Sequence, residues 1–151
     1  MPDSWPPEFL DGPALEYTLE RLRECAEQRD WWLHFIVLVH GAGRGGPGRT
    51  LIGSAGYKGP PADGVVEIGY GIVRSHQRRG YASEAVQMLL TRAFAVPAVE
   101  RVIAETLPEL TPSIGVLRKC GFEAIGEGSE PGVIRFEMTR AMYASSRGGT
   151  R

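Results

Sequence analysis

The order of helix-type and strand-type segments constrains the fold of this chain more than any other feature of its sequence. Apolar residues at helical spacing indicate helices at residues 11–28 and 82–93. Thr111, Pro112 and Gly121 are typical of the N-cap, first turn and C-terminal stop of a short third helix. Runs rich in β-branched and aromatic residues predict strands at residues 31–40, 49–59, 65–73, 99–106, 122–128 and 132–140. Hairpins supply antiparallel pairs, and a helix between two strands allows a parallel pair, so we expect an α/β fold with a mixed sheet.

Length and composition predict a single domain. The chain has 151 residues, of which 42% are hydrophobic and 23% charged, close to an average folded protein. We expect the domain to occupy residues 1–143 and residues 144–151 to form a flexible C-terminal tail, because SSRGGTR lacks apolar periodicity.

Charge and hydropathy exclude several classes of function. The formal net charge is -1, whereas a general binder of nucleic acid or of membrane surfaces needs a basic excess. No apolar run approaches the roughly 20 residues that cross a bilayer, and MPDSWPPEFLDGP does not resemble a signal peptide, so we expect a cytoplasmic location. Cys25 and Cys120 lie far from each other and from any histidine cluster, so neither a disulfide framework nor a metal site is predicted.

Two glycine-bearing segments invite comparison with phosphate-binding loops. GAGRGG, residues 41–46, has the letters of a dinucleotide-binding motif, but turn and strand residues follow it where that motif needs a helix. We interpret it as a hairpin loop. SHQRRGYASEA, residues 75–85, does have a strand before it and a helix after it. Taken alone, it fits equally a phosphate cradle of helix amides assisted by arginines, or a charged surface turn.

QRRGYA, residues 77–82, resembles the (Q/R)-x-x-G-x-(G/A) signature of the GNAT superfamily of acyl-CoA-dependent N-acyltransferases. EIGYGIV before it and ETLPELTPSIGVLRKCGF after it fall in that family's order and spacing, so the likeness extends over about residues 65–127. It is strongest to the branch of ribosomal-protein N-terminal acetyltransferases. The resemblance implies an acetyl-CoA-dependent N-acetyltransferase with no metal, whose mostly antiparallel sheet has helices on its faces and two central strands that splay apart. The acceptor would be a small-molecule amine or a protein N-terminus.

The resemblance also assigns residues to the cofactor. The amides of residues 78–83 would hold the pyrophosphate, and the main chain of residues 72–73 would pair with the pantetheine arm. The cofactor-binding residues implied in this way are Ile72, Val73, Gln77, Arg78, Arg79, Gly80, Tyr81, Ala82, Ser83 and Lys119. A bulge at Gly69 and Gly71 would open the sheet for the cofactor; the competing interpretation is that these glycines merely relieve crowding under Tyr70.

Acyl transfer to an amine needs a base for the amine proton and a donor for the departing thiolate. Glu67 lies near the position where several family members carry a catalytic glutamate, so it is the expected base. A solvated surface carboxylate is the competing interpretation, and Glu105 is the second candidate. Ser113 matches a serine of the ribosomal-protein branch and is the expected donor, although a serine in the first turn of a helix is also ordinary capping chemistry.

The sequence departs from the family pattern in three places. Leu110 stands where the branch usually has asparagine, and Leu117 stands where many members have a tyrosine. Both changes leave open a second hypothesis, a regulatory module that binds acyl-CoA without catalysis. Only MPDSWPPEFL precedes the first predicted helix, so we expect the usual first strand to be missing, very short, or lost to a mis-assigned start of the sequence. The sheet edge left exposed could be covered by a second copy of the chain in a homodimer.

Overall fold

The computed structural model describes residues 19–20, 23, 30–43 and 46–148. The elements, in chain order, are β1 (Leu33–Gly43), β2 (Gly46–Tyr57), β3 (Val65–Ile72), the 3-10 helix η2 (Arg74–His76), α2 (Tyr81–Phe94), β4 (Arg101–Thr106), α3 (Thr111–Lys119), β5 (Glu123–Glu127), β6 (Ile134–Thr139) and α4 (Arg140–Gly148). Of the helix predicted at residues 11–28, only Leu19, Glu20 and Arg23 lie inside the described ranges, and all three are helical. The question of a first strand before that helix falls outside them.

The strands form one sheet in the order β1-β2-β3-β4-β6-β5. Three pairs of strands that are consecutive in the sequence are antiparallel: β1 with β2 and β5 with β6, both expected as hairpins, and β2 with β3. β4 pairs antiparallel with β6, and β3 with β4 is parallel because helix α2 carries the chain back between them. The predicted α/β fold with a mixed, mostly antiparallel sheet is therefore confirmed.

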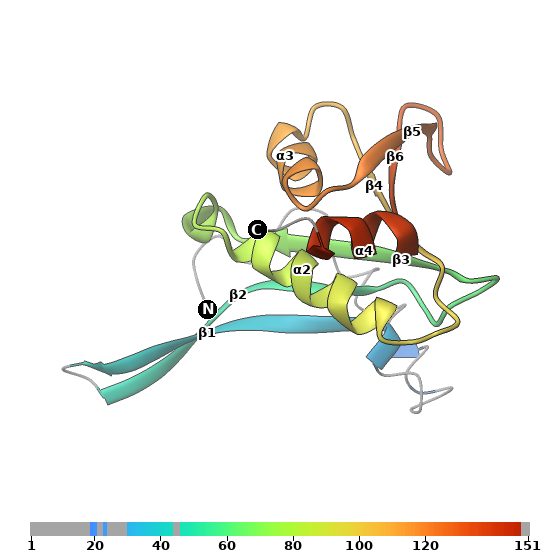
Figure 1. The fold of residues 1–151 in the computed structure, drawn as a ribbon. Coiled ribbons are helices and arrows are strands. Elements are labelled where there is room, and N and C mark those ends of the chain that lie inside the picture. Colours follow the sequence, from blue (N-terminus) through green and yellow to red (C-terminus); the bar gives the residue numbers. More distant parts are fainter. Residues whose placement is uncertain (1–18, 21–22, 24–29, 44–45, 149–151) are drawn as a thin grey trace.

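The glycine segment at residues 41–46 belongs to the β1–β2 hairpin, where Gly43 pairs with Gly46. The described residues of this segment all belong to strands, which agrees with its interpretation as a hairpin. This hairpin extends away from the body of the molecule (Figure 1). β1 and β5 are the two edge strands of the described sheet. Pairing of an exposed edge with a second copy of the chain stays a prediction.

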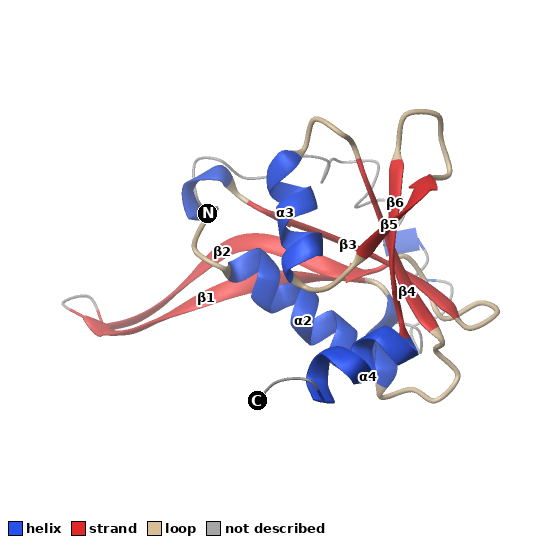
Figure 2. Cartoon of the chain, turned by 45° about the horizontal axis from the view of Figure 1, so that its top comes forward, coloured by secondary structure: helices blue, strands red, loops and turns tan. Residues whose placement is uncertain are grey.

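Helix α2 covers one face of the sheet and carries much of the core. It packs against β2 and β3, while α4 packs against β6, and both helices lie in front of the sheet in Figure 2. Val86, Leu90 and Ala93 of α2 are fully buried against the sheet. The Tyr57 hydroxyl donates a hydrogen bond to the Leu89 carbonyl, which ties β2 to the helix. Within the described ranges, no helix combines the length and the apolar character needed to cross a bilayer.

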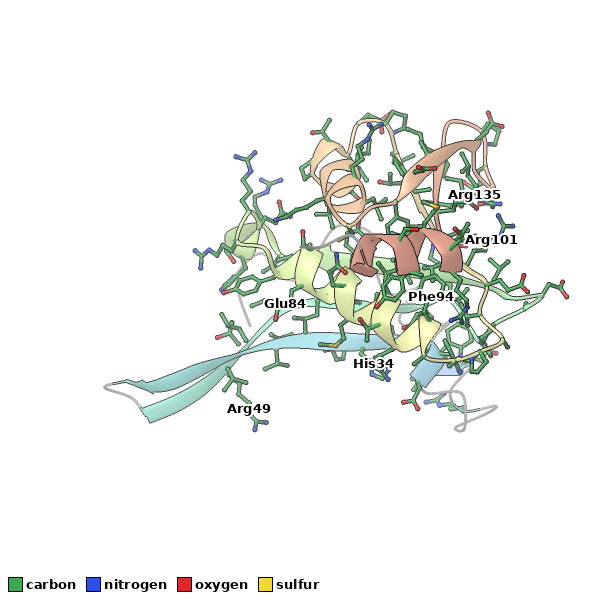
Figure 3. The ribbon with its side chains drawn as sticks, in the orientation of Figure 1. His34, Arg49, Glu84, Phe94, Arg101 and Arg135 are labelled. Atoms are coloured by element: carbon green, nitrogen blue, oxygen red, sulfur yellow. The ribbon has the colours of Figure 1, made fainter. Side chains whose placement is uncertain are left out.

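Arg140 joins β6 to the C-terminal end of α2. Its guanidinium donates hydrogen bonds to the carbonyls of Phe94, Val96 and Val99, at distances of 2.6 to 3.0 Å. It also lies over the Phe94 ring, 5.3 Å from the ring centre, and Figure 3 labels that ring beneath α4. Carbonyls at a helix C-terminus lack partners within the helix, so a cation there satisfies them and interacts favourably with the helix dipole.

Three expectations about local structure were wrong. Thr111 is the first residue of α3 rather than its N-cap, because Leu110 takes the cap position and Pro112, which needs no N–H partner, fits the second position too. Residues 144–148, expected to belong to a flexible tail, are instead helical, since α4 continues to Gly148. The β2–β3 register runs without a shift from Gly53 and Ile72 to Tyr57 and Ile68, so no bulge forms at Gly69 or Gly71.

Candidate functional site

The sheet opens between β3 and β4. Their parallel pairing ends at Ile68 and Ala104, yet β3 continues to Ile72 and β4 continues to Thr106 along β6. Figures 1 and 2 both show β4 and β6 turning away from β3 beyond this point. The predicted splay therefore exists without the predicted bulge, because β3 follows β2 while β4 follows β6. The backbone edge of β3 from Gly69 onward faces the opening.

The segment after β3 brings the unpaired amides of α2 to this opening. Glu84 is the first residue of α2 whose N–H bonds within the helix, to Gly80, so the three amides before it point out of the helix end. Figure 3 labels Glu84 in this first turn. Gly80 has φ of +86°, and a side-chain carbon at this position would meet no atom within 4 Å. Its backbone angle, not a lack of space, therefore requires glycine.

A cavity of about 740 Å³ lies between this loop and α3. The predicted cofactor residues that line it are Ile72, Gln77, Arg78, Gly80, Tyr81, Ala82, Ser83 and Lys119. Arg74 and His76 add basic side chains, and Glu109 adds an acidic one. Basic groups and helix amides on one wall can together hold a phosphate-bearing ligand, although the chain as a whole carries a net charge of -1.

Two predicted cofactor residues do not line this cavity, namely Val73 and Arg79. Val73 is fully buried, and its N–H donates to the Ile52 carbonyl over 2.8 Å. The carbonyl of Ile72 accepts a hydrogen bond from the Gln77 side chain over 2.9 Å. Those main-chain groups are therefore already engaged. Gly71, which lines the cavity on the open edge of β3, was not singled out as a cofactor residue from the sequence.

A second cavity, of about 680 Å³, lies beside the first. Its walls come from β2, β3, the end of β4 and the loop between β5 and β6. The two cavities share four lining residues, Tyr70, Gly71, Leu110 and Ser113. They therefore meet at the opening of the sheet, where a ligand in one cavity can contact a ligand in the other.

A pair of hydroxyl groups lies at this meeting point. The Tyr70 hydroxyl is 3.1 Å from the Ser113 side-chain oxygen and 3.1 Å from the Ser113 carbonyl. The phenol can donate to the carbonyl while the serine hydroxyl donates to the phenol oxygen. Burial raises the pKa of Tyr70 to about 12, against a smaller opposite effect of the Ser113 hydrogen bond. The Tyr70 phenol therefore stays protonated at physiological pH. Ser113 was expected at the site from the sequence, whereas Tyr70 was not.

The two candidate bases are placed differently. Glu67 lines neither cavity, and its carboxylate lies 2.7 Å from the Lys58 ammonium, which does line the second cavity. Glu105 lines the second cavity directly, but both of its oxygens are engaged. Burial acts to raise the pKa of Glu105, but hydrogen bonds and charge from Ser129 and Arg135 outweigh it and hold that pKa below its ordinary value.

The two leucines that depart from the family pattern have separate environments. Leu117 is fully buried in the core and lines neither cavity, so its side chain does not reach the meeting point. Leu110 lines both cavities, so its apolar side chain lies at their meeting point. In the part of the chain that the structure describes, no group of His, Cys, Asp or Glu side chains is arranged to hold a metal ion.

Comparisons with known proteins give a consistent result. Residues 4–123 match the family model described as "Acetyltransferase (GNAT) domain". The chain is 39% identical over 77 residues to an uncharacterized N-acetyltransferase, p20, of Bacillus licheniformis, a match covering 50% of this chain and 43% of that protein. A relative from Bacillus subtilis, YjdG, is likewise matched over 44% of its length. The chain thus spans less than half the length of these curated relatives.

Solved structures share the fold. The GNAT domain of S. lividans PAT is 26% identical, with a TM-score of 0.52, over 62% of this chain and 58% of that one. An aminoglycoside acetyltransferase in complex with coenzyme A is 24% identical, with a TM-score of 0.56, over 65% of each chain.

Proposed function

The chain belongs to the GNAT acetyltransferase family, and on that premise we propose that it transfers an acetyl group from acetyl-CoA directly to a primary amine. The observation that carries the proposal is the contact between two cavities at the opening between β3 and β4. The first cavity has the basic side chains and helix amides that suit the phosphates of CoA, and the second has room for an acceptor. Acetyl-CoA, when bound, would supply the reactive thioester carbonyl.

We assign the phosphate end of the cofactor to Gly80 and the amides of residues 81–83, with Arg78 and Lys119 as charged contacts. The pantetheine arm would follow the open edge of β3 at Gly71, because the neighbouring groups of Ile72 and Val73 are already hydrogen-bonded. This path would bring the thioester toward Tyr70 and Ser113. It requires no movement of the sheet, since the strands are already apart.

The reaction forms a C–N bond to the amine and breaks the C–S bond of the thioester. The amine nitrogen loses a proton and the departing thiolate gains one, so no other reactant is needed. The Tyr70 and Ser113 hydroxyls are the proposed donors to the thiolate. Glu67 remains the proposed base, acting through water, because it lies outside the cavity wall and its carboxylate is paired with Lys58.

For the acceptor we propose two classes of amine rather than one compound. The second cavity, of about 680 Å³, has room for a small-molecule amine. The likeness to the ribosomal-protein branch suggests a protein N-terminus as the alternative. Solved proteins of this fold include an aminoglycoside acetyltransferase in complex with kanamycin and a spermidine/spermine N-acetyltransferase. Kanamycin and spermidine therefore belong in a first panel of acceptors, together with a peptide bearing a free N-terminus.

The test follows free thiol during incubation of the protein with acetyl-CoA and this panel, while calorimetry measures CoA binding. Turnover with at least one amine is expected. Glu67→Gln should then lower kcat by about 100-fold, whereas Glu123→Gln, at an exposed position on β5 that lines neither cavity, should leave kcat unchanged.

A non-catalytic acyl-CoA-binding module is the second candidate, favoured by Leu110 at the meeting point of the cavities. A module would bind CoA normally but turn over no amine in the panel. If the chain neither binds CoA nor turns over any amine, both functions are excluded.

A further inference from the structure

The loop between β5 and β6, residues 128–133, forms one wall of the second cavity. Ser129, Glu130 and Val133 from this loop line the cavity opposite residues of β2 and β3. This hairpin loop has six residues and includes a glycine at φ of +85°, Gly132. A side chain from the sheet holds it against the cavity.

Glu105, at the end of β4, holds this loop. One carboxylate oxygen accepts from the Ser129 amide over 2.8 Å, and the other accepts from the Ser129 hydroxyl over 2.7 Å. The first oxygen also accepts two hydrogen bonds from the Arg135 guanidinium, over 2.9 and 2.8 Å. The Glu105 side chain is only 10% exposed, and its bonds to Arg135 are partly buried, whereas its bonds to Ser129 lie at the surface. Figure 3 labels Arg135 beside this loop.

The start of the loop is fitted to the same carboxylate. A side-chain carbon at Gly128 would lie 2.7 Å from a Glu105 oxygen and 2.8 Å from a Val133 methyl, closer than such contacts occur. The Gly128 amide donates to the Val133 carbonyl over 2.7 Å, which closes the loop at its base. Glycine at this position lets the loop approach β4 closely enough for Ser129 to reach Glu105.

We propose that Glu105 is a positioning residue that fixes the 128–133 loop as a wall of the acceptor cavity and thereby determines which amines fit. This inference rests on the proposed function only in assigning the second cavity to the acceptor. Glu105 is then not the base, because a carboxylate whose oxygens already accept four hydrogen bonds is poorly placed to take a proton from an amine.

The test uses the full chain saturated with CoA and measures, by calorimetry, the Kd of two probe amines of different bulk, spermidine and kanamycin. Glu105→Gln replaces a carboxylate oxygen with an NH₂ group that cannot accept from Arg135 or Ser129. Gly128→Ala disturbs the contact between Glu105 and the loop from the loop side. It is the substitute variant if Glu105→Gln does not fold. The matched control is Glu137→Gln, which breaks the 3.0 Å pair with Arg101 between the same two strands but lines neither cavity.

We expect Glu105→Gln and Gly128→Ala to change the ratio of the two amine Kd values by about tenfold, with the CoA Kd within about twofold of the original. Hydrogen exchange of the Ser129 amide should become faster, and Glu137→Gln should change neither quantity. An unchanged ratio in both variants, or an equal change in the control, would overturn the proposal. So would a Glu105→Gln variant that binds both amines normally and loses kcat alone, because that result identifies a base.

Failure of the proposed function gives a different result. If the amines bind and their Kd ratio shifts as expected but no acetyl group is transferred by the unsubstituted chain, the catalytic proposal falls while the role of Glu105 stands. If neither probe binds the CoA-saturated chain, the assignment of the cavity to amines falls, and the proposal falls with it.

Discussion

The hydroxyl of Tyr70 on β3 lies 3.1 Å from the hydroxyl of Ser113 on α3, at the point where the two cavities meet. The two residues are separated by 43 positions in the sequence, and they meet where β3 has parted from β4. A neutral phenol supported by a second hydroxyl is suited to protonate a thiolate as it departs.

Tyr70→Phe should lower kcat by about 100-fold, because it removes the proposed proton donor from the meeting point of the cavities. The CoA Kd should stay within about twofold of the original value, since the phosphate end of the cavity is untouched. Steady-state kinetics and calorimetry measure the two quantities separately. Ser113→Ala should have a smaller effect in the same direction, because the phenol retains its own proton.

Tyr143→Phe is the control for this prediction. It also removes a tyrosine hydroxyl that lies 3.1 Å from another hydroxyl, that of Thr91, but between α2 and α4 and away from both cavities. A kcat unchanged in Tyr70→Phe, or reduced equally in Tyr143→Phe, would rule out the donor role of Tyr70.

Gly80→Val should weaken CoA binding by about 10- to 100-fold, because a β-branched residue at φ of +86° is strained by about 1–3 kcal/mol and turns the helix amides away from the ligand. Arg79→Ala should weaken CoA binding by no more than about threefold, since Arg79 does not line the cavity. Calorimetric titration with CoA measures both variants. The reverse order would mean that the loop binds through its charge rather than through its backbone.

Arg140→Ala should destabilise the fold by about 2–4 kcal/mol, because the carbonyls of Phe94, Val96 and Val99 lose a shared cationic donor. Urea unfolding followed by circular dichroism measures the free energy of unfolding. Arg92→Ala is the comparison, because it removes an exposed 3.8 Å pair with Asp30 and should cost less than about 1 kcal/mol. Equal losses in the two variants would contradict the structural role of Arg140.

The contribution of Glu105 to stability should depend on pH. Its folded-state pKa lies below the ordinary value of 4.5, so its stabilising effect is fully present above about pH 4.5 and is lost as the pH falls through the folded pKa. At neutral pH, Glu105→Gln should therefore lower the free energy of unfolding by about 1–3 kcal/mol. The difference between variant and unsubstituted protein should shrink below pH 4.5. Unfolding curves measured at several pH values check this, and a difference that grows in acid would contradict it.

The order of elements could be read from the sequence because it depends on local signals. Hydrophobic periodicity, together with the glycine and proline residues that end segments, predicted every described strand and the helices α2 and α3 to within a few residues. α4 was missed because residues 140–148 combine a short apolar stretch with serines, arginine and glycine, and the helix is stabilised by packing on β6. The candidate phosphate-binding loop could be singled out because a helix start and a glycine at positive φ are local properties as well.

The sequence by itself thus determined the α/β class, the strand and helix order and the loop at residues 75–85. Only the tertiary structure decided which side chains work together. It brought Tyr70 to Ser113, engaged Glu105 with Arg135 and Ser129, and placed Leu117 in the core rather than at the site. The reason is physical: those contacts depend on sheet register and on where two strands separate, and both are set by packing between segments far apart in the chain.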